Sequence, residues 1–104
     1  MKILGIDPGV GRIGFGCIEV GKKTPKFIDA GVITTTIRGE NGARLLELSE
    51  SLSDLLSEVK PDVASVEKLF FAQNVSTAIE VAQARGVILL CLQQHGVAIA
   101  VYTP

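Results

Sequence analysis

The chain opens on Ile3-Leu4-Gly5-Ile6-Asp7-Pro8-Gly9, an apolar run that stops at an acidic residue and a Pro-Gly turn. A short run of branched apolar residues around a glycine predicts a strand over residues 2–7 that is buried on both faces. Asp7 is the last residue of this strand. An ionised carboxylate at the end of a buried strand is costly unless it is paired or bound to a metal, so Asp7 is a candidate functional residue.

Two more strands are predicted directly after the Pro-Gly turn. Residues 12–20 alternate bulky apolar residues with small ones, and residues 26–36 are rich in Val, Ile and Thr. Residues 21–25 contain the glycine and proline that suit a turn between them. The amino-terminal part is therefore expected to form a three-stranded antiparallel meander.

The rest of the chain alternates helices with strands. Leucines at helical spacing, with acidic residues on the other face, predict an amphipathic helix over residues 44–60 that ends before Pro61. The later predicted elements are a strand at 62–67, a helix at 74–95 with Gly96 as its stop, and a strand at 97–102. This order predicts a single α/β domain over residues 1–104, with a mixed five-stranded sheet and helices packed on it.

Composition and charge set broad limits on function. A chain of 104 residues that is 47% hydrophobic suits one compact core. Ten basic and eleven acidic side chains give a net charge of −1, which neither favours nor excludes a nucleic-acid partner. Cys17 and Cys91 lie in apolar segments without CxxC spacing, as reduced core thiols do. The chain shows no signal-peptide pattern and no membrane-spanning run, so a soluble, cytoplasmic protein is expected.

Glu67 closes the predicted strand at 62–67 in the same way that Asp7 closes the first strand. Side chains alternate along a strand, so Asp7 shares its face with Gly5, and Glu67 shares its face with Ser65. If the two strands are adjacent, these small residues leave room for an ion. Oxygen ligands suit Mg²⁺ or Mn²⁺, and the chain has no His/Cys cluster for zinc. The alternative is a turn-capping Asp and a solvated Glu, which residue spacing alone favours.

Residues 9–14, GVGRIG, match the pattern G-x-G-x-x-G of dinucleotide-binding proteins. That motif must open a helix, whereas residues 14–18 continue in strand alternation, which argues against a dinucleotide site. A sugar-kinase or actin-like ATPase fold also places an Asp and glycines at such a turn, but it needs a second phosphate loop that residues 15–104 do not show. The glycines more simply give a tight turn and let a phosphate backbone come close.

Residues 68–74, KLFFAQN, place two aromatic residues next to the second carboxylate. An exposed ring at Phe70 could stack on or wedge between bases, and Lys68, Gln73 and Asn74 could bond phosphates or bases. The alternative is that the aromatic rings are buried beneath the loop, which residue type alone favours. Arg12, in the glycine-rich turn, is a further candidate for DNA contact.

Small residues recur every four positions in the predicted second helix, at Ala78, Ala82 and Gly86. Such a stripe lets a helix pack closely, and a mid-helix glycine costs about 1 kcal/mol relative to alanine unless a contact requires it. Packing on the sheet is the default expectation, and a helix-to-helix dimer is the alternative. Arg85 beside this stripe is expected to form a surface salt bridge or to lie near DNA.

These residues together resemble the RuvC family of crossover junction endodeoxyribonucleases. The matching stretches are residues 3–9 with 14–16, Arg44-Leu45, Pro61-Asp62, residues 66–74, Gln83-Ala84-Arg85-Gly86 and residues 102–104. The Ile-Asp-Pro-Gly start is shared with other RNase H-like nucleases. The Glu-x-Leu-Phe-Phe loop together with Gln-Ala-Arg-Gly is highly specific to this family.

The resemblance implies an RNase H-like fold in a bacterial cytoplasmic protein that resolves Holliday junctions in recombination and repair. It implies a homodimer that nicks a four-way DNA junction symmetrically with Mg²⁺, two ions per complete site, and that works with RuvA and RuvB. By position, Asp7 and Glu67 would be two of four metal-binding catalytic carboxylates, and Phe70 would disturb base stacking. The second helix would carry much of the dimer interface.

The chain departs from the family pattern at its carboxyl end, because the other two carboxylates lie on a later helix. With half of the ligands missing, we expect the chain as given to be inactive and to expose apolar sheet surface. Two alternatives stay open. The chain could act only as a dimerising or junction-binding module, or it could be a YqgF-type nuclease of the same fold that acts on RNA.

Overall fold

The computed structural model describes residues 1–9, 11–36, 40–67 and 75–102. It contains a five-stranded sheet in the order β3-β2-β1-β4-β5. The strands are β1 (Lys2–Asp7), β2 (Arg12–Glu19), β3 (Lys26–Thr34), β4 (Val63–Glu67) and β5 (Ala98–Tyr102). The β1–β2 and β2–β3 pairs are antiparallel, and the β1–β4 and β4–β5 pairs are parallel. The predicted meander and mixed sheet are confirmed.

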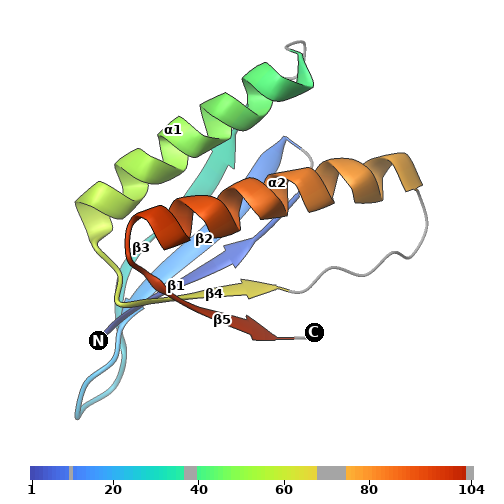
Figure 1. Cartoon of the computed structure of the whole chain (residues 1–104). Coiled ribbons are helices and arrows are strands. Elements are labelled where there is room, and N and C mark those ends of the chain that lie inside the picture. Colours follow the sequence, from blue (N-terminus) through green and yellow to red (C-terminus); the bar gives the residue numbers. More distant parts are fainter. Residues whose placement is uncertain (10, 37–39, 68–74, 103–104) are drawn as a thin grey trace.

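Two helices, α1 (Asn41–Val59) and α2 (Val75–Gln94), pack on the same side of the sheet (Figure 1). The helix α1 begins at Asn41 rather than at Arg44, because its first turn, Asn-Gly-Ala, carries no large apolar residue that the helical pattern could reveal. It ends at Val59, and the next residue, Lys60, adopts a left-handed conformation with φ of 52° and donates its backbone N–H to the Leu56 carbonyl. Gly96 ends α2 with φ of 68°, as predicted.

One side of the sheet, the helix-covered face, holds the core. Leu4 and Ile6 of β1 point there and are 0% and 3% exposed. The register pairs Leu4 with both Cys17 and Ala64, so the buried residues of neighbouring strands share this face. The core includes Leu4, Ile6, Ile13, Cys17, Ala64 and Val66 from the strands and Leu48, Leu52, Leu56, Ile88 and Leu92 from the helices.

The other side of the sheet, the open face, carries the alternate residues Ile3, Gly5 and Asp7 of β1 and their neighbours. No helix among the described residues covers it (Figure 1). Ile3 is half-buried and Asp7 is exposed, so the expectation that β1 is buried on both faces is wrong. Exposed apolar residues of the open face include Ile18, Phe27 and Val32. The sequence predicted that such surface would be exposed.

A group of hydrogen bonds that we call the Asp62 clasp joins the starts of three strands. The Asp62 carboxylate accepts from the backbone N–H of Lys2 at 2.8 Å, and the backbone N–H of Asp62 donates to the Lys2 carbonyl at 2.9 Å. The Asp62 carbonyl accepts from the N–H of Ala98 at 3.3 Å. These bonds fix how β1, β4 and β5 begin relative to one another.

Both cysteines are buried, as predicted, and burial raises the pKa of the Cys17 thiol.

Neither of the helices in the described part of the chain is long and apolar enough to cross a membrane.

Candidate functional site

Asp7 and Glu67 lie side by side at the carboxyl ends of the neighbouring strands β1 and β4. The strands β1 and β4 run parallel with Ile6 opposite Val66, so the next residues of each strand, the two acids, end at the same edge and point to the open face. Their side chains share a hydrogen bond, which is the main cause of a raised pKa at Glu67; desolvation and the negative charge of Asp7 add to it. The two carboxyl groups are therefore in direct contact, and this contact favours the protonated form of Glu67.

The floor of this site is built from residues with little or no side chain. Gly5, Gly14 and Gly16 line a surface hollow of about 290 Å³ together with the two acids. Gly14 pairs with Asp7 across β1 and β2, and a Cβ built on Gly14 would lie 3.9 Å from the Asp7 Cβ. The hollow beside the carboxylates thus stays open, as the small residues in the sequence led us to expect.

The carboxyl pair fits a divalent cation. Two carboxylates in contact repel each other once both are ionised, and a hard cation bound between them would offset that repulsion. Within residues 1–9, 11–36, 40–67 and 75–102, no group of three or more His, Cys, Asp or Glu side chains could hold a metal ion. Asp7 and Glu67 therefore provide only part of the ligands that Mg²⁺ or Mn²⁺ requires.

The turn after Asp7 depends on its glycines. A Cβ on Gly9 would collide with the backbone carbonyl of Arg12, and Gly11 has φ of 68° and accepts a bond from the Thr35 N–H at 3.0 Å. The chain then enters β2 rather than a helix. The dinucleotide interpretation is excluded by this geometry, because that motif must open a helix and this turn leads directly into a strand.

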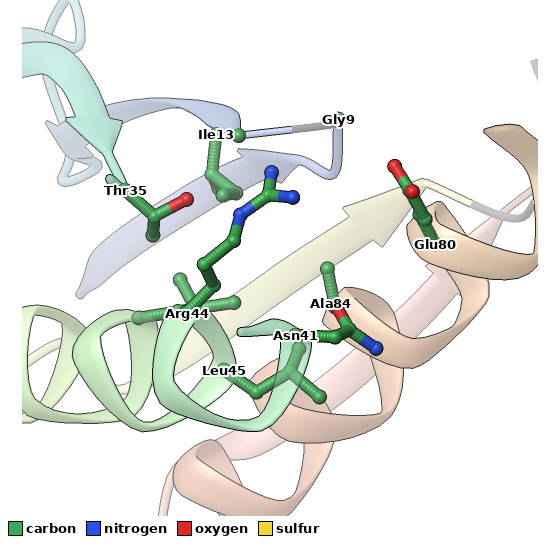
Figure 2. Close-up of a pocket in the computed structure, with 10 residues that line it drawn as sticks. Gly9, Ile13, Thr35, Asn41, Arg44, Leu45, Glu80 and Ala84 are labelled. Carbon is green, nitrogen blue, oxygen red and sulfur yellow. The ribbon is translucent and has the colours of Figure 1, made fainter. Parts of the chain in front are cut away.

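Two arginines from the helices reach the backbone on either side of the acid pair. The Arg44 guanidinium of α1 points at the glycine turn (Figure 2), and its Nη2 lies 3.1 Å from the position that a Gly11 Cβ would take. Its Nε is buried with no hydrogen-bond partner among the described residues. The Arg85 Nε of α2 donates to the backbone carbonyl of Glu67 at 3.3 Å. Both arginines lie in stretches that resemble the RuvC family, but a surface salt bridge or a DNA contact was expected for Arg85, and neither contact with the backbone was predicted.

The model of the family "Crossover junction endodeoxyribonuclease RuvC" matches residues 3–104. The chain belongs to the RuvC family. It is 52% identical over its whole length to the RuvC protein of Petrotoga mobilis and 44% identical to that of Prochlorococcus marinus subsp. pastoris. It spans 64% and 66% of the lengths of these two relatives.

A solved RuvC structure shares the fold closely. The structure of T. thermophilus RuvC in complex with a Holliday junction substrate matches the whole chain with a TM-score of 0.90 and 25% identity. The chain covers 66% of that RuvC chain. The RNase H-like fold inferred from the sequence is confirmed.

Of the residues expected to contact DNA, only Arg12 lies in the described part of the chain. Arg12, the first residue of β2, is exposed and follows the glycine turn next to the acid pair. The other predicted contacts fall on a segment outside the described residues, namely Lys68, Phe70, Gln73 and Asn74.

The stripe expected at the RuvC dimer interface lies away from the sheet. Gly86 is exposed, and a Cβ built on it would have no neighbour within 4 Å, so packing on the sheet does not explain this glycine. Ala78 and Ala82 are half-buried. For Gly86 the default expectation of sheet packing is wrong, because Ala84 and Ile88, on another side of α2, enter the core instead.

Proposed function

We propose that this chain forms the greater part of a structure-selective endonuclease that resolves Holliday junctions by symmetric, metal-dependent nicking. The observation that carries the proposal is the pair Asp7 and Glu67, held in contact at the ends of two parallel strands over a glycine floor. The chain belongs to the RuvC family, whose model is named for crossover junction endodeoxyribonucleases, and this supports a DNA junction as the substrate. Four-way junction DNA is also what the T. thermophilus relative holds.

In this proposal Asp7 and Glu67 bind and orient two Mg²⁺ or Mn²⁺ ions per complete site. Bound there, such ions lower the pKa of the attacking water and offset the charge of the leaving oxygen. In this proposal the DNA backbone approaches the carboxylates over the hollow lined by Gly5, Gly14 and Gly16, which have no side chains to block it. Exposed Arg12 would contact a phosphate, and Lys68, Phe70, Gln73 and Asn74 would hold and unstack the bases near the cut.

Two carboxylates alone would leave two divalent cations poorly coordinated and with excess positive charge. We therefore propose that the chain as given does not cleave, and that the site is completed by two further carboxylates from the third of its relatives' length that the chain does not span.

The cleavage test compares three proteins on a labelled four-way junction with Mg²⁺ or Mn²⁺. They are this chain, the chain extended by the carboxyl-terminal third of the Petrotoga relative, and the extended form with Asp7→Asn. We expect paired, symmetric nicks from the extended protein only. Asp7→Asn should slow cleavage at least a hundredfold, which corresponds to about 2.7 kcal/mol of transition-state stabilisation. If the extended protein binds junctions but leaves them intact with either metal, a binding role replaces the nuclease.

Symmetric nicking requires two sites related by a twofold axis, so we propose a homodimer formed through α2. Ile79 and Leu90 of α2 are 52% and 58% exposed although the opposite side of the helix is in the core. A helix that is apolar all round is typical of one covered on two sides. Exposed Gly86, between them, would let the partner helix come close. By family resemblance, RuvA and RuvB would act with this dimer.

The dimer proposal has a matched pair of variants. Leu90 on α2 and Leu46 on α1 are both exposed leucines, at 58% and 60%. Leu90→Glu would place a charge in the proposed interface, whereas Leu46→Glu would not. Sedimentation equilibrium should therefore show a monomer for Leu90→Glu and a dimer for both Leu46→Glu and the unmodified chain. A dimer that survives Leu90→Glu would place the interface elsewhere.

A further inference from the structure

The carboxyl end of β4 has fewer strand partners than its middle. Pairing between β1 and β4 runs from Ile3 opposite Val63 to Ile6 opposite Val66 and does not extend to Glu67. On the other side, Glu67 pairs only with Tyr102, the last residue of edge strand β5. The sheet alone therefore holds the backbone of Glu67 less firmly than that of the residues before it.

Arg85 contacts this same backbone from the helix side. Its Nε donates to the Glu67 carbonyl at 3.3 Å, and the arginine is half-buried. The helix that carries it is firmly placed, because Ala84 and Ile88 beside Arg85 are buried in the core. A guanidinium group on such a rigid base can fix a carbonyl in position, since its N–H donors lie in one plane.

We infer that Arg85 is a positioning residue for the metal site, which it serves by fixing the backbone of Glu67 and thereby directing its carboxylate toward Asp7. The inference rests on the proposed function, because it assumes that Glu67 binds a cation. Arg85 acts from the helix-covered face on a ligand that points to the open face, so it touches neither the ion nor the DNA.

Charge and position predict opposite effects of removing Arg85. A guanidinium near a cation site repels the cation, so if charge were its only influence, a neutral residue would strengthen metal binding. If Arg85 holds Glu67 in place, a neutral residue must weaken metal binding. Replacing a group that hydrogen-bonds to a metal-binding residue, and so orients it, typically lowers the metal affinity 10- to 100-fold.

The first experiment measures Mn²⁺ affinity of this chain by electron paramagnetic resonance of the free ion. We expect Arg85→Met to weaken binding by about tenfold or more, and Arg85→Lys, which keeps a charged donor, to restore part of the loss. Gln93→Met, an exposed change on the same helix, is the matched control and should have no effect. Unchanged or tighter binding in Arg85→Met overturns the inference.

Glu67→Gln separates this inference from the proposed function. If Glu67→Gln binds Mn²⁺ as the unmodified chain does, the metal site itself is wrong. If Glu67→Gln weakens binding and Arg85→Met does not, only the role of Arg85 is wrong.

A second measurement needs no metal. Hydrogen exchange at the β4 amides should quicken in Arg85→Met at Val66 and Glu67 but not at Ala64, with no general loss of protection at the core of β1. This selective pattern supports the inference even if the chain binds Mn²⁺ too weakly to measure. If every β4 amide of Arg85→Met exchanges at the same rate as in the Gln93→Met control, the inference is overturned.

Discussion

The two faces of the sheet are made from alternate residues of the same strands, yet one face packs into the core and the other carries the two carboxyl groups. On β1, Leu4 and Ile6 fill the core beneath the helices, while Gly5 and Asp7 between them stand on the open face. The helix-covered face is closely packed with branched side chains. The open face has glycines and two carboxyl groups in contact.

Strand alternation thus assigns stability to one face of the sheet and the chemistry of the carboxyl pair to the other. A residue pointing one way contributes through burial, and its neighbour pointing the other way is free to be small or charged. Substitutions one residue apart should therefore have effects of different kind and size.

The largest expected difference concerns Leu4 and Ile3, neighbours that point to opposite faces. Leu4→Ala should lower the free energy of unfolding by about 2–5 kcal/mol, since it leaves a cavity in the core. Ile3→Ala, on the open face and only half-buried, should cost clearly less. Urea denaturation of the two variants measures both values. Equal losses would mean that the open face is packed against something in solution, such as a second copy of the chain.

A smaller difference is expected between Gly31 and Gly16, which lie on opposite faces of β3 and β2. A Cβ on Gly31 would come within 3.1 Å of the Phe15 ring, whereas a Cβ on Gly16 would meet nothing within 4 Å. Gly31→Ala should cost about 1 kcal/mol by crowding, and Gly16→Ala should stabilise the strand by about 0.5 kcal/mol. Thermal unfolding of both variants is the check. A loss at Gly16 as large as that at Gly31 would contradict the open hollow.

The smallest expected effect comes from the contact between Asp7 and Glu67, whose hydrogen bond is the main cause of the raised pKa of Glu67. Because Asp7 raises the pKa of Glu67 above its ordinary value of 4.5, folded Glu67 holds its proton more tightly than unfolded Glu67. This stabilising contribution is fully present below pH 4.5 and is lost as the pH rises through the raised pKa of the folded state. Without metal, Asp7→Asn should therefore be slightly more stable than the unmodified chain at pH 7 but not at pH 4.

The control for this pH effect is Asp54→Asn, which removes one exposed charge on α1 far from the pair. Thermal melts at both pH values compare the three proteins. Adding Mg²⁺ at pH 7 should raise the melting temperature of the unmodified chain more than that of Asp7→Asn. An equal metal response in the two proteins would show that Asp7 does not bind the ion.

Much of the fold could be predicted because its strands and α1 carry clear patterns. The alternation in β2 and the leucine spacing in α1 each specify an element and its inward side. The adjacency of Asp7 and Glu67 could be stated only conditionally, since nothing local specifies which strands pair. The parallel register of β1 and β4 supplied that missing step.

The predictions were wrong where the pattern of apolar residues does not show which side of an element is buried. α2 has apolar residues on all sides, so the sequence did not show which stripe enters the core, and Gly86 was assigned to sheet packing although it is exposed. β1 looked buried on both faces because an apolar run does not show whether a second layer covers it. The contacts of Arg44 and Arg85 join distant elements, and no local pattern signals them.

The Asp62 clasp lies at the end of the sheet opposite the acid pair, yet the pair depends on it. Its hydrogen bonds tie two residues that are 60 positions apart in sequence and so choose one alignment of β1 against β4. A slip by a single residue would turn Asp7 and Glu67 to opposite sides of the sheet. Sheet registry is thus a requirement for bringing the ligands together, and the same slip would also turn Ala64 and Val66 of β4 out of the core.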